Sequence, residues 1–156
     1  MKKIGIAMVV THSGRGDALR ARPMAAHPLP EENAIYFLTD GRAEKGDEVA
    51  HNTNVCLAFS DVGSQKYVSV TGRADISDDR GKIKQLWSEN EKAFWRDEND
   101  PAIRVLRVLP EEAEYWDSSG SIVTYLKVAL ARLTSEKPNL HENEKVRLAD
   151  SPSLEG

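Results

Sequence analysis

Two neighbouring segments of the chain alternate apolar and other residues with a period of two. In the segment 54–60, Val55, Leu57 and Phe59 occupy every second position, and the segment 66–76 follows the same pattern. Successive side chains of a strand point to opposite faces of a sheet, so this period predicts two strands that each bury one face. The short connection between them favours a hairpin, and therefore an antiparallel sheet.

Further extended segments lie on both sides of this pair. They are bounded by clusters of Gly, Pro, Asn and Asp, which favour turns. Pro110 is expected to kink the last of them. Five or six strands in hairpin order, with short helices inserted, predict a mainly β fold, an antiparallel barrel with added helices. The additional strands are expected at 4–10, 19–27, 34–39, 102–109 and 111–117.

Three helices are expected between or after the strands. The first spans 42–52, with Asp40 as its N-cap, and a C-terminal amphipathic helix spans 121–134. The polar composition from residue 136 onward predicts a disordered tail, so the domain is expected at 1–135 and the tail at 136–156. The second helix is expected to run from a cap at Ser77, Asp78 or Asp79 to about residue 95, with an apolar stripe of Ile83, Leu86, Trp87, Ala93 and Phe94.

Charge and composition limit the classes of partner. Of the 156 residues, 21 are Lys or Arg and 25 are Asp or Glu, so the net charge is −4 and no global basic field favours nucleic acid or an anionic membrane. No apolar stretch approaches the roughly 20 residues of a transmembrane helix. Cys56 is the single cysteine, which excludes an intramolecular disulfide and favours a reducing, cytoplasmic setting.

Common catalytic signatures are absent from the sequence. It has no GxGxxG, P-loop, GxSxG or HExxH motif, so Rossmann dinucleotide binding, phosphoryl transfer, serine hydrolysis and zinc proteolysis lack support. The histidines at 12, 27, 51 and 141 lack the spacing of metal ligands and are interpreted as loop or surface residues. No residue stands out as a general acid or base, and none is assigned as catalytic.

The predicted strand 19–27 is unusual because it places two cations in an otherwise apolar segment. Arg20, Arg22 and Met24 share one face. A guanidinium group offers a planar fork of donors that suits phosphate. Other anion-binding or aromatic groups also fall at the ends of predicted elements, and together they indicate a local anion site. These are Thr39, Lys45, Tyr67 and Trp116.

A series of short motifs occurs in order along the chain and resembles a known family. They are RPM at 22–24, FLTD at 37–40, Lys45 ahead of VAHNTNVCLAFSD, YVSVTGRADI at 67–76, an Asp-rich helix with Trp87, and PEEAEYWDS at 110–118. The series resembles the general stress protein 26 group of pyridoxamine 5′-phosphate oxidase-like, FMN-binding split-barrel proteins. The resemblance implies a six-stranded antiparallel split barrel and a homodimer that holds FMN in two clefts between the subunits.

The resemblance also implies roles for particular residues. Arg22 and Lys45 match residues that grip the FMN phosphate, and Pro23 and Met24 match strand backbone beside the isoalloxazine ring. Arg20 is added because it shares a face with Arg22. The remaining matches are Leu38 and Thr39 beside the ribityl chain and ring, Tyr67 at the place of a polar residue near the flavin, and Trp116 as an aromatic residue near the cofactor.

Two departures from the family pattern argue against oxidation of pyridoxamine phosphate. The true oxidases have a further basic residue before the phosphate-binding Lys, whereas this chain has Glu44. Their C-terminal Arg-x-His element, which recognises the pyridoxal substrate, has no counterpart after Trp116. We therefore do not expect this chain to be a pyridoxamine phosphate oxidase.

Three functions remain open at this stage. The leading one is an FMN-binding flavoprotein in which the flavin performs redox chemistry with a small-molecule electron donor or acceptor. The second is a stress-response protein that stores or senses flavin without turnover. The third is a flavin-dependent reductase on which a reduced nicotinamide docks transiently, which needs no Rossmann unit. FMN is favoured over FAD or a deazaflavin.

Overall fold

The computed structural model describes residues 5–14, 17–42, 45–116 and 144–147, with the side chains of 45–47 and 144–147 outside the description. Within these ranges the chain forms one antiparallel sheet in the order β2-β1-β5-β6-β7-β4-β3, with β8 paired to β7. The strands are β1 (Ile6–His12), β2 (Leu19–Ala25), β3 (His27–Leu29), β4 (Ala34–Asp40), β5 (Asn54–Asp61), β6 (Lys66–Ser77), β7 (Ile103–Trp116) and β8 (Glu144–Arg147).

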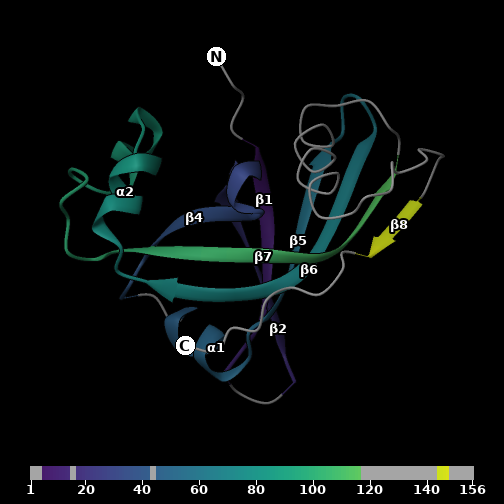
Figure 1. Cartoon of the computed structure of the whole chain (residues 1–156), viewed down its shortest axis with the longest axis horizontal. Coiled ribbons are helices and arrows are strands. Elements are labelled where there is room, and N and C mark those ends of the chain that lie inside the picture. Colours follow the sequence, from purple (N-terminus) through teal and green to yellow (C-terminus); the bar gives the residue numbers. More distant parts are fainter. Residues whose placement is uncertain (1–4, 15–16, 43–44, 117–143, 148–156) are drawn as a thin grey trace.

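The sheet curls into a half-barrel, which confirms the predicted mainly β, antiparallel split-barrel class. Figure 1 shows β7 running along the length of the molecule, β1 crossing it steeply in this view, and β6 bending upward beside β5. The curl brings β2, at one end of the strand order, against β4 near the other end. Six strands have at least seven residues, as expected for a six-stranded barrel, while β3 and β8 are short additions of three and four.

The two segments expected on either side of Pro110 form one strand, since β7 runs through this proline, and an irregularity does occur there. The irregularity is a shift in the pairing of β6 with β7, where Thr71 pairs with Glu112 and Gly72 with Pro110. A Cβ at Gly72 would lie 2.2 Å from the carbonyl oxygen of Leu109, so only glycine fits this close approach. Because the pairing is irregular at this point, the strand tolerates a proline, which has no N–H to donate, and stays continuous.

Helix α1 (Lys45–His51) is shorter than the predicted 42–52, and Asp40 is not its N-cap. Asp40 instead ends β4 and accepts hydrogen bonds from the backbone N and the Nε of Arg42, at 2.8 and 2.9 Å. These contacts lower the pKa of Asp40 to about 2. The carboxylate therefore closes the turn after β4 rather than capping the helix.

The predicted helix from 78 to 95 is two elements. Asp79 caps α2 (Arg80–Leu86) by accepting from Lys82 N at 3.0 Å, as one of the three expected caps. The helix ends at Trp87, and Ser88 caps a separate 3₁₀ helix, η2 (Glu89–Ala93). Ile83 and Leu86 are buried as expected, but Phe94 is 77% exposed because this break turns it out of the expected stripe.

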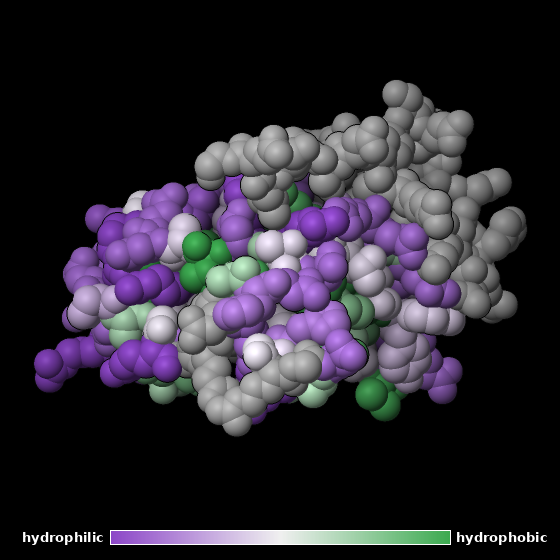
Figure 2. Space-filling model, turned by 90° about the horizontal axis from the view of Figure 1, so that it is seen from below, coloured by the Kyte–Doolittle hydropathy of each residue, from purple (hydrophilic) through white to green (hydrophobic). Residues whose placement is uncertain are grey.

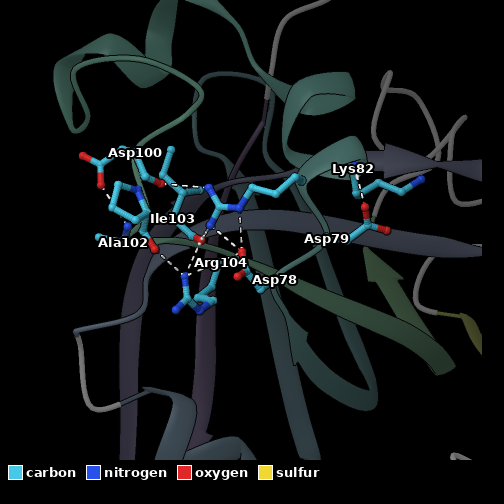
Figure 3. Close-up of polar contacts among 9 residues, drawn as sticks. Asp78, Asp79, Lys82, Asp100, Ala102, Ile103 and Arg104 are labelled. Carbon is cyan, nitrogen blue, oxygen red and sulfur yellow. Dashed lines mark hydrogen bonds and ion pairs between the residues drawn. The ribbon is translucent and has the colours of Figure 1, made fainter.

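Polar contacts fix α2 to the beginning of β7. Arg80 donates from Nη1 to the carbonyl oxygen of Asp100 at 2.9 Å and from Nη2 to that of Ile103 at 2.8 Å. Figure 3 shows Asp100, Ile103 and Arg104 gathered beside Asp78, with Asp79 and Lys82 at the start of the helix. Because η2 follows α2 directly, these contacts also set the position of η2.

Strand β4, which carries Leu38 and Thr39, is buried on both faces. One face, with Ile35 and Phe37, belongs to the core inside the curled sheet. The other face, with Tyr36 and Leu38, packs in a second core with residues of α2 and β7. The continuous apolar run AIYFL is therefore explained by two layers that meet at this strand.

Two predicted elements fall mainly outside the described residues. The helix at 121–134 lies wholly outside them. Of the segment 136–156, for which the sequence predicts disorder, residues 144–147 form β8 against β7 and the rest lies outside the description. The division of the chain at residue 135 stays a prediction.

The outer surface gives two further observations. Figure 2 views the molecule from below and shows a face on which hydrophilic residues predominate and hydrophobic residues are scattered among them. In the part of the chain that the structure describes, no helix is long and apolar enough to cross a membrane.

Candidate functional site

Strand β2 presents its two arginines as the alternation predicts. Arg20, Arg22 and Met24 lie on the same face, and Met24 is buried in the core of the sheet. Pro23 lies on the opposite face, across from Met8 of β1. Among the described strands β2 pairs only with β1, so it is an edge strand and tolerates a proline that lacks an N–H.

Arg22 binds a buried carboxylate from α1. Its Nη1 and Nη2 donate to the two oxygens of Glu48 at 2.9 and 2.8 Å, and Thr11 Oγ1 donates to Glu48 Oε2 at 2.7 Å. Only 3% of the Glu48 side chain is exposed. The hydrogen bonds from Arg22 lower the pKa of Glu48, against the opposing effect of burial. We call these three residues together with Arg20 the arginine cluster.

The arginine cluster carries a net positive charge. Arg20 Nη1 lies 3.6 Å from Glu48 Oε1, and 52% of the Arg20 side chain is exposed. Two guanidinium groups therefore share one carboxylate. Glu48 occupies the fork of Arg22, so Arg20 is the more accessible of the two for an anion from solution.

Lys45 is the first residue of α1, one helical turn before Glu48. Since Glu48 binds Arg22, the backbone of Lys45 lies on the helix that contacts the arginine cluster. Its side chain is outside the described part of the structure. A shared ligand of Arg22 and Lys45 therefore stays a prediction.

A cavity of about 580 Å³ lies beside β2 and β4, within the usual range of roughly 300–1,000 Å³ for small-molecule sites. One wall, which we call the strand wall, brings together four of the residues that the sequence proposes for the cofactor. Its lining residues come from β1, β2 and β4. They are Ile6, Pro23, Met24, Ala25, Leu38, Thr39 and Asp40.

The rest of the lining, which we call the η2 wall, consists of His27, Glu91, Phe94 and Trp95. His27 begins β3, while the other three lie in η2 or directly after it. His27 Nε2 is 3.2 Å from Glu91 Oε1, and both side chains are largely buried. The interpretation of His27 as a loop or surface residue is therefore wrong, because His27 lies in β3 and its side chain is largely buried.

Tyr67 and Trp116 occupy a different part of the sheet. They are cross-strand partners in β6 and β7, and both are exposed. Neither lines the cavity described above. Within one chain, the structure thus brings Pro23, Met24, Leu38 and Thr39 together and leaves Tyr67 and Trp116 apart from them.

Sequence reasoning missed two acidic residues, Glu48 beside Arg22 and Glu91 beside His27. Glu48 is 26 positions from Arg22, and no local pattern connects them. Glu91 had a readable signal, because Ser88-x-x-Glu91 is a capping box and the structure forms it. The signal lay inside a segment expected to be one continuous helix.

Comparison with protein families now places the chain. The family model described as pyridoxamine 5′-phosphate oxidase like matches residues 1–139. The chain belongs to this family. The match confirms the resemblance drawn from the sequence motifs. In a comparison with curated proteins, no match is found.

Solved structures with the same fold come from several bacteria. General stress protein 26 from Bacillus anthracis shares 20% identity at a TM-score of 0.65, covering 73% of this chain and 85% of its own. The general stress FMN/FAD binding protein of Xanthomonas citri shares 24% identity at a TM-score of 0.64, covering 77% and 84%. A pyridoxamine 5′-phosphate oxidase-related, FMN binding protein of Nostoc punctiforme shares 13% at 0.59, covering 74% and 75%. At these identities the likeness establishes the fold.

Proposed function

We propose that this protein binds FMN, with the phosphate at the arginine cluster and the isoalloxazine ring against the strand wall of the cavity. The observation that carries the proposal is the continuity of β2. Its residues Arg20 and Arg22 belong to the arginine cluster, and the next residues, Pro23 and Met24, line the cavity. A ligand with a phosphate at one end and a flat ring at the other suits this arrangement.

The strand wall fits a flavin ring. Its lining is mainly apolar, from Ile6, Met24 and Leu38, and Thr39 adds a hydroxyl group at the end of β4. An apolar cavity with few polar groups is the usual form of a site for an aromatic ligand. Pro23 stiffens the strand beside the ring position, since its φ angle is fixed.

The arginine cluster fits a phosphate, but with one opposing charge. Arg20 is exposed enough to meet an anion, and Lys45 begins the adjoining helix. Glu48 neutralises part of the positive charge and holds the fork of Arg22. We infer that Arg20 and Lys45 make the main phosphate contacts. Arg22, whose guanidinium group is bound to Glu48, contributes positive charge without contacting the phosphate directly.

The exposed pair Tyr67 and Trp116 supports a dimer as part of the proposal. These residues do not line the cavity of their own chain, so their predicted contact with the flavin requires a second copy. Exposed apolar side chains on β1 and β2, among them Ile6, Met8 and Leu19, give a surface for such a copy. We therefore propose a homodimer with the cofactor at the subunit interface.

A bound flavin would supply hydride or electron transfer, and the protein would supply position and electrostatics. The chain's own contribution is to hold the phosphate with fixed cations, and to exclude water from the ring by the apolar walls. We therefore propose that the protein has a flavin-dependent redox role and acts on a small molecule. Its single cysteine favours a cytoplasmic location.

The test is to purify the full chain, record its visible spectrum, and identify any molecule released on denaturation. We expect a yellow protein that releases FMN, or a colourless one that takes up FMN on titration. Addition of a nicotinamide donor without oxygen separates a reductase, which bleaches, from a storage or sensing protein, which does not.

A variant tests the phosphate assignment. Arg20→Ala combined with Lys45→Ala should release FMN and keep the dimer, since each charged hydrogen bond contributes roughly 1.5–3 kcal/mol. Arg73→Ala is the matched control, because Arg73 is an exposed cation of β6 that pairs with Glu111. FMN titrations that are unchanged in the double variant would reject the assignment.

A further inference from the structure

The arginine cluster contains an anion of its own. Glu48 accepts from both Nη atoms of Arg22, at 2.9 and 2.8 Å, and Arg20 Nη1 lies 3.6 Å from its Oε1. A carboxylate that accepts two N–H bonds from one guanidinium group uses the same planar fork that a phosphate uses. The protein therefore fills, with its own side chain, the contact that a phosphate would otherwise make at Arg22.

Glu48 is firmly held in this position. Thr11 Oγ1 donates to its Oε2 at 2.7 Å, and only 3% of the side chain is exposed. The hydrogen bonds from Arg22 are the largest cause that lowers the pKa of Glu48, so the carboxyl group is ionised near pH 7. An anion from solution thus meets Arg22 with its fork already occupied by a charged group.

The charge of Glu48 also acts on an anion that contacts Arg20 alone. Charges in water are screened over about 8 Å at physiological ionic strength, and partly buried charges are screened less. Because Oε1 of Glu48 is 3.6 Å from Arg20 Nη1, a phosphate oxygen that accepts from this Nη1 lies closer to the carboxylate than that length. The carboxylate therefore repels the phosphate that Arg20 attracts.

The contributions of Glu48 to the fold and to a phosphate have opposite signs. Arg20 and Arg22 lie on the same face of β2, where their like charges repel, and Glu48 offsets this repulsion by lying close to both. Its carboxylate also joins α1 to β1 and β2 through Thr11 and Arg22. The same charge that stabilises the chain lowers the positive potential that a phosphate meets.

Arg22 stays within reach of a ligand even so. Of its side chain 24% is exposed, and it lies two residues from Arg20 on the same strand face. A phosphate that contacts Arg20 is consequently a neighbour of Arg22. If Glu48 did not hold the fork of Arg22, this guanidinium group could donate further charged hydrogen bonds to the phosphate.

We propose that Glu48 sets the affinity of the arginine cluster for the flavin phosphate by holding Arg22 away from it, and that FMN therefore exchanges with the solution. The inference rests on the proposed function, because it concerns the same phosphate. It goes further in one respect: the flavin is a ligand that the protein takes up and releases, as a co-substrate is, and not a permanently bound group.

The test compares FMN with riboflavin in fluorescence titrations of the full chain and of Glu48→Gln. Glutamine keeps the shape of the side chain but has one oxygen in place of two, so it does not hold the whole fork of Arg22. FMN should bind Glu48→Gln about tenfold more tightly than wild type, as one charged hydrogen bond implies, and riboflavin should bind both equally. Glu111→Gln, at the exposed pair with Arg73, is the matched control and should leave both affinities unchanged.

A double variant assigns the effect to Arg22. In Arg22→Ala combined with Glu48→Gln, the preference for FMN over riboflavin should return to the wild-type value, because the released fork is absent. A gain that persists in this double variant overturns the role of Arg22. Circular dichroism verifies the fold of each variant before the titrations.

Two further measurements follow the exchange directly. Passage through a desalting column should remove FMN from wild type and leave most of it on Glu48→Gln. In the ¹⁵N-labelled wild-type chain, FMN should shift the Nε–H signal of Arg20 more than that of Arg22, since Glu48 keeps the second group from the phosphate. The NMR measurement decides the question even where Glu48→Gln does not fold.

An unchanged or weaker FMN affinity of Glu48→Gln, or a larger shift at Arg22 than at Arg20 in wild type, overturns the inference. If wild type still prefers FMN to riboflavin, these results reject this inference alone. If wild type binds neither flavin, the proposed function is rejected and this inference with it.

Discussion

The two buried carboxylates, Glu48 and Glu91, lie in contrasting surroundings. Glu48 accepts two hydrogen bonds from Arg22 and has a second arginine close by, so its surroundings are positive. Glu91 accepts a hydrogen bond from the backbone N of Ser88. Its neighbour His27 is kept neutral by burial, which lowers the pKa of the imidazole, so His27 adds no positive charge beside this carboxyl group. The arginine cluster thus has a net positive charge, whereas the described lining of the cavity includes two carboxyl groups, Asp40 and Glu91, and no Lys or Arg.

For the FMN site that we propose, this difference predicts where each end of the ligand lies. A phosphate would be repelled from the η2 wall, whereas a flat apolar ring would gain little at the exposed guanidinium of Arg20. The orientation of the ligand follows from charge before any specific contact is made. The predictions below alter one end at a time.

The largest expected effect is on the stability of the arginine cluster. Glu48→Gln keeps the shape of the side chain but removes the charge that binds Arg22, so the free energy of unfolding should fall by roughly 1.5–3 kcal/mol. Urea unfolding at pH 7 measures it. Glu111→Gln, at an exposed ion pair with Arg73, is the control and should change little.

The same variant has a signature in pH. Arg22 lowers the pKa of Glu48 in the folded protein, so the ionised carboxylate contributes stability above the unfolded value, near 4.5. That contribution is lost as the pH falls through the folded pKa. Wild type and Glu48→Gln should therefore converge in stability at acid pH, and a constant difference down to pH 3 would speak against the pairing.

An intermediate effect is expected at the η2 wall. Ser88→Ala removes the hydroxyl group that caps η2 and holds Glu91, which should lower the free energy of unfolding by about 1 kcal/mol. Thermal unfolding checks this, with Ser60→Ala, an exposed serine of β5, as the control. If the two variants are equally stable, the capping box is not what fixes the wall.

How much of this was predictable depends on the range of the interactions. The strands 54–60 and 66–76 were predicted because each has a local period of two, set by one buried face, as at Val55, Leu57 and Phe59. The pairing of Arg22 with Glu48 was not, since it joins β2 to α1 through the fold alone. The resemblance to the family located the strand wall of the cavity, whereas the η2 wall required the coordinates.

The helix break at Ser88 was missed although its sequence signal is local. The apolar stripe that includes Ile83 and Leu86 suggested one long helix and concealed it. The stripe is correct as far as Trp87, which is half-buried against the second core. Beyond it, the capping box turns the chain and exposes Phe94.

The smallest effect concerns the histidine of the η2 wall. Burial lowers the pKa of His27 below its ordinary value of 6.5, so the unfolded chain binds the proton more tightly than the folded one. Stability should therefore decline as the pH falls from 6.5 toward the folded pKa. Urea midpoints at pH 7.5 and 5.5 should show a shallower decline in His27→Gln than in wild type.

The most direct test of the central claim compares FMN with riboflavin, which has the same ring and no phosphate. The wild-type protein should bind FMN at least about tenfold more tightly in a fluorescence titration, because charged hydrogen bonds to the phosphate contribute roughly 1.5–3 kcal/mol each. In Arg20→Ala combined with Lys45→Ala this preference should disappear, while riboflavin binding stays the same. Equal affinities of wild type for the two flavins, or a preference that survives both substitutions, would contradict the account.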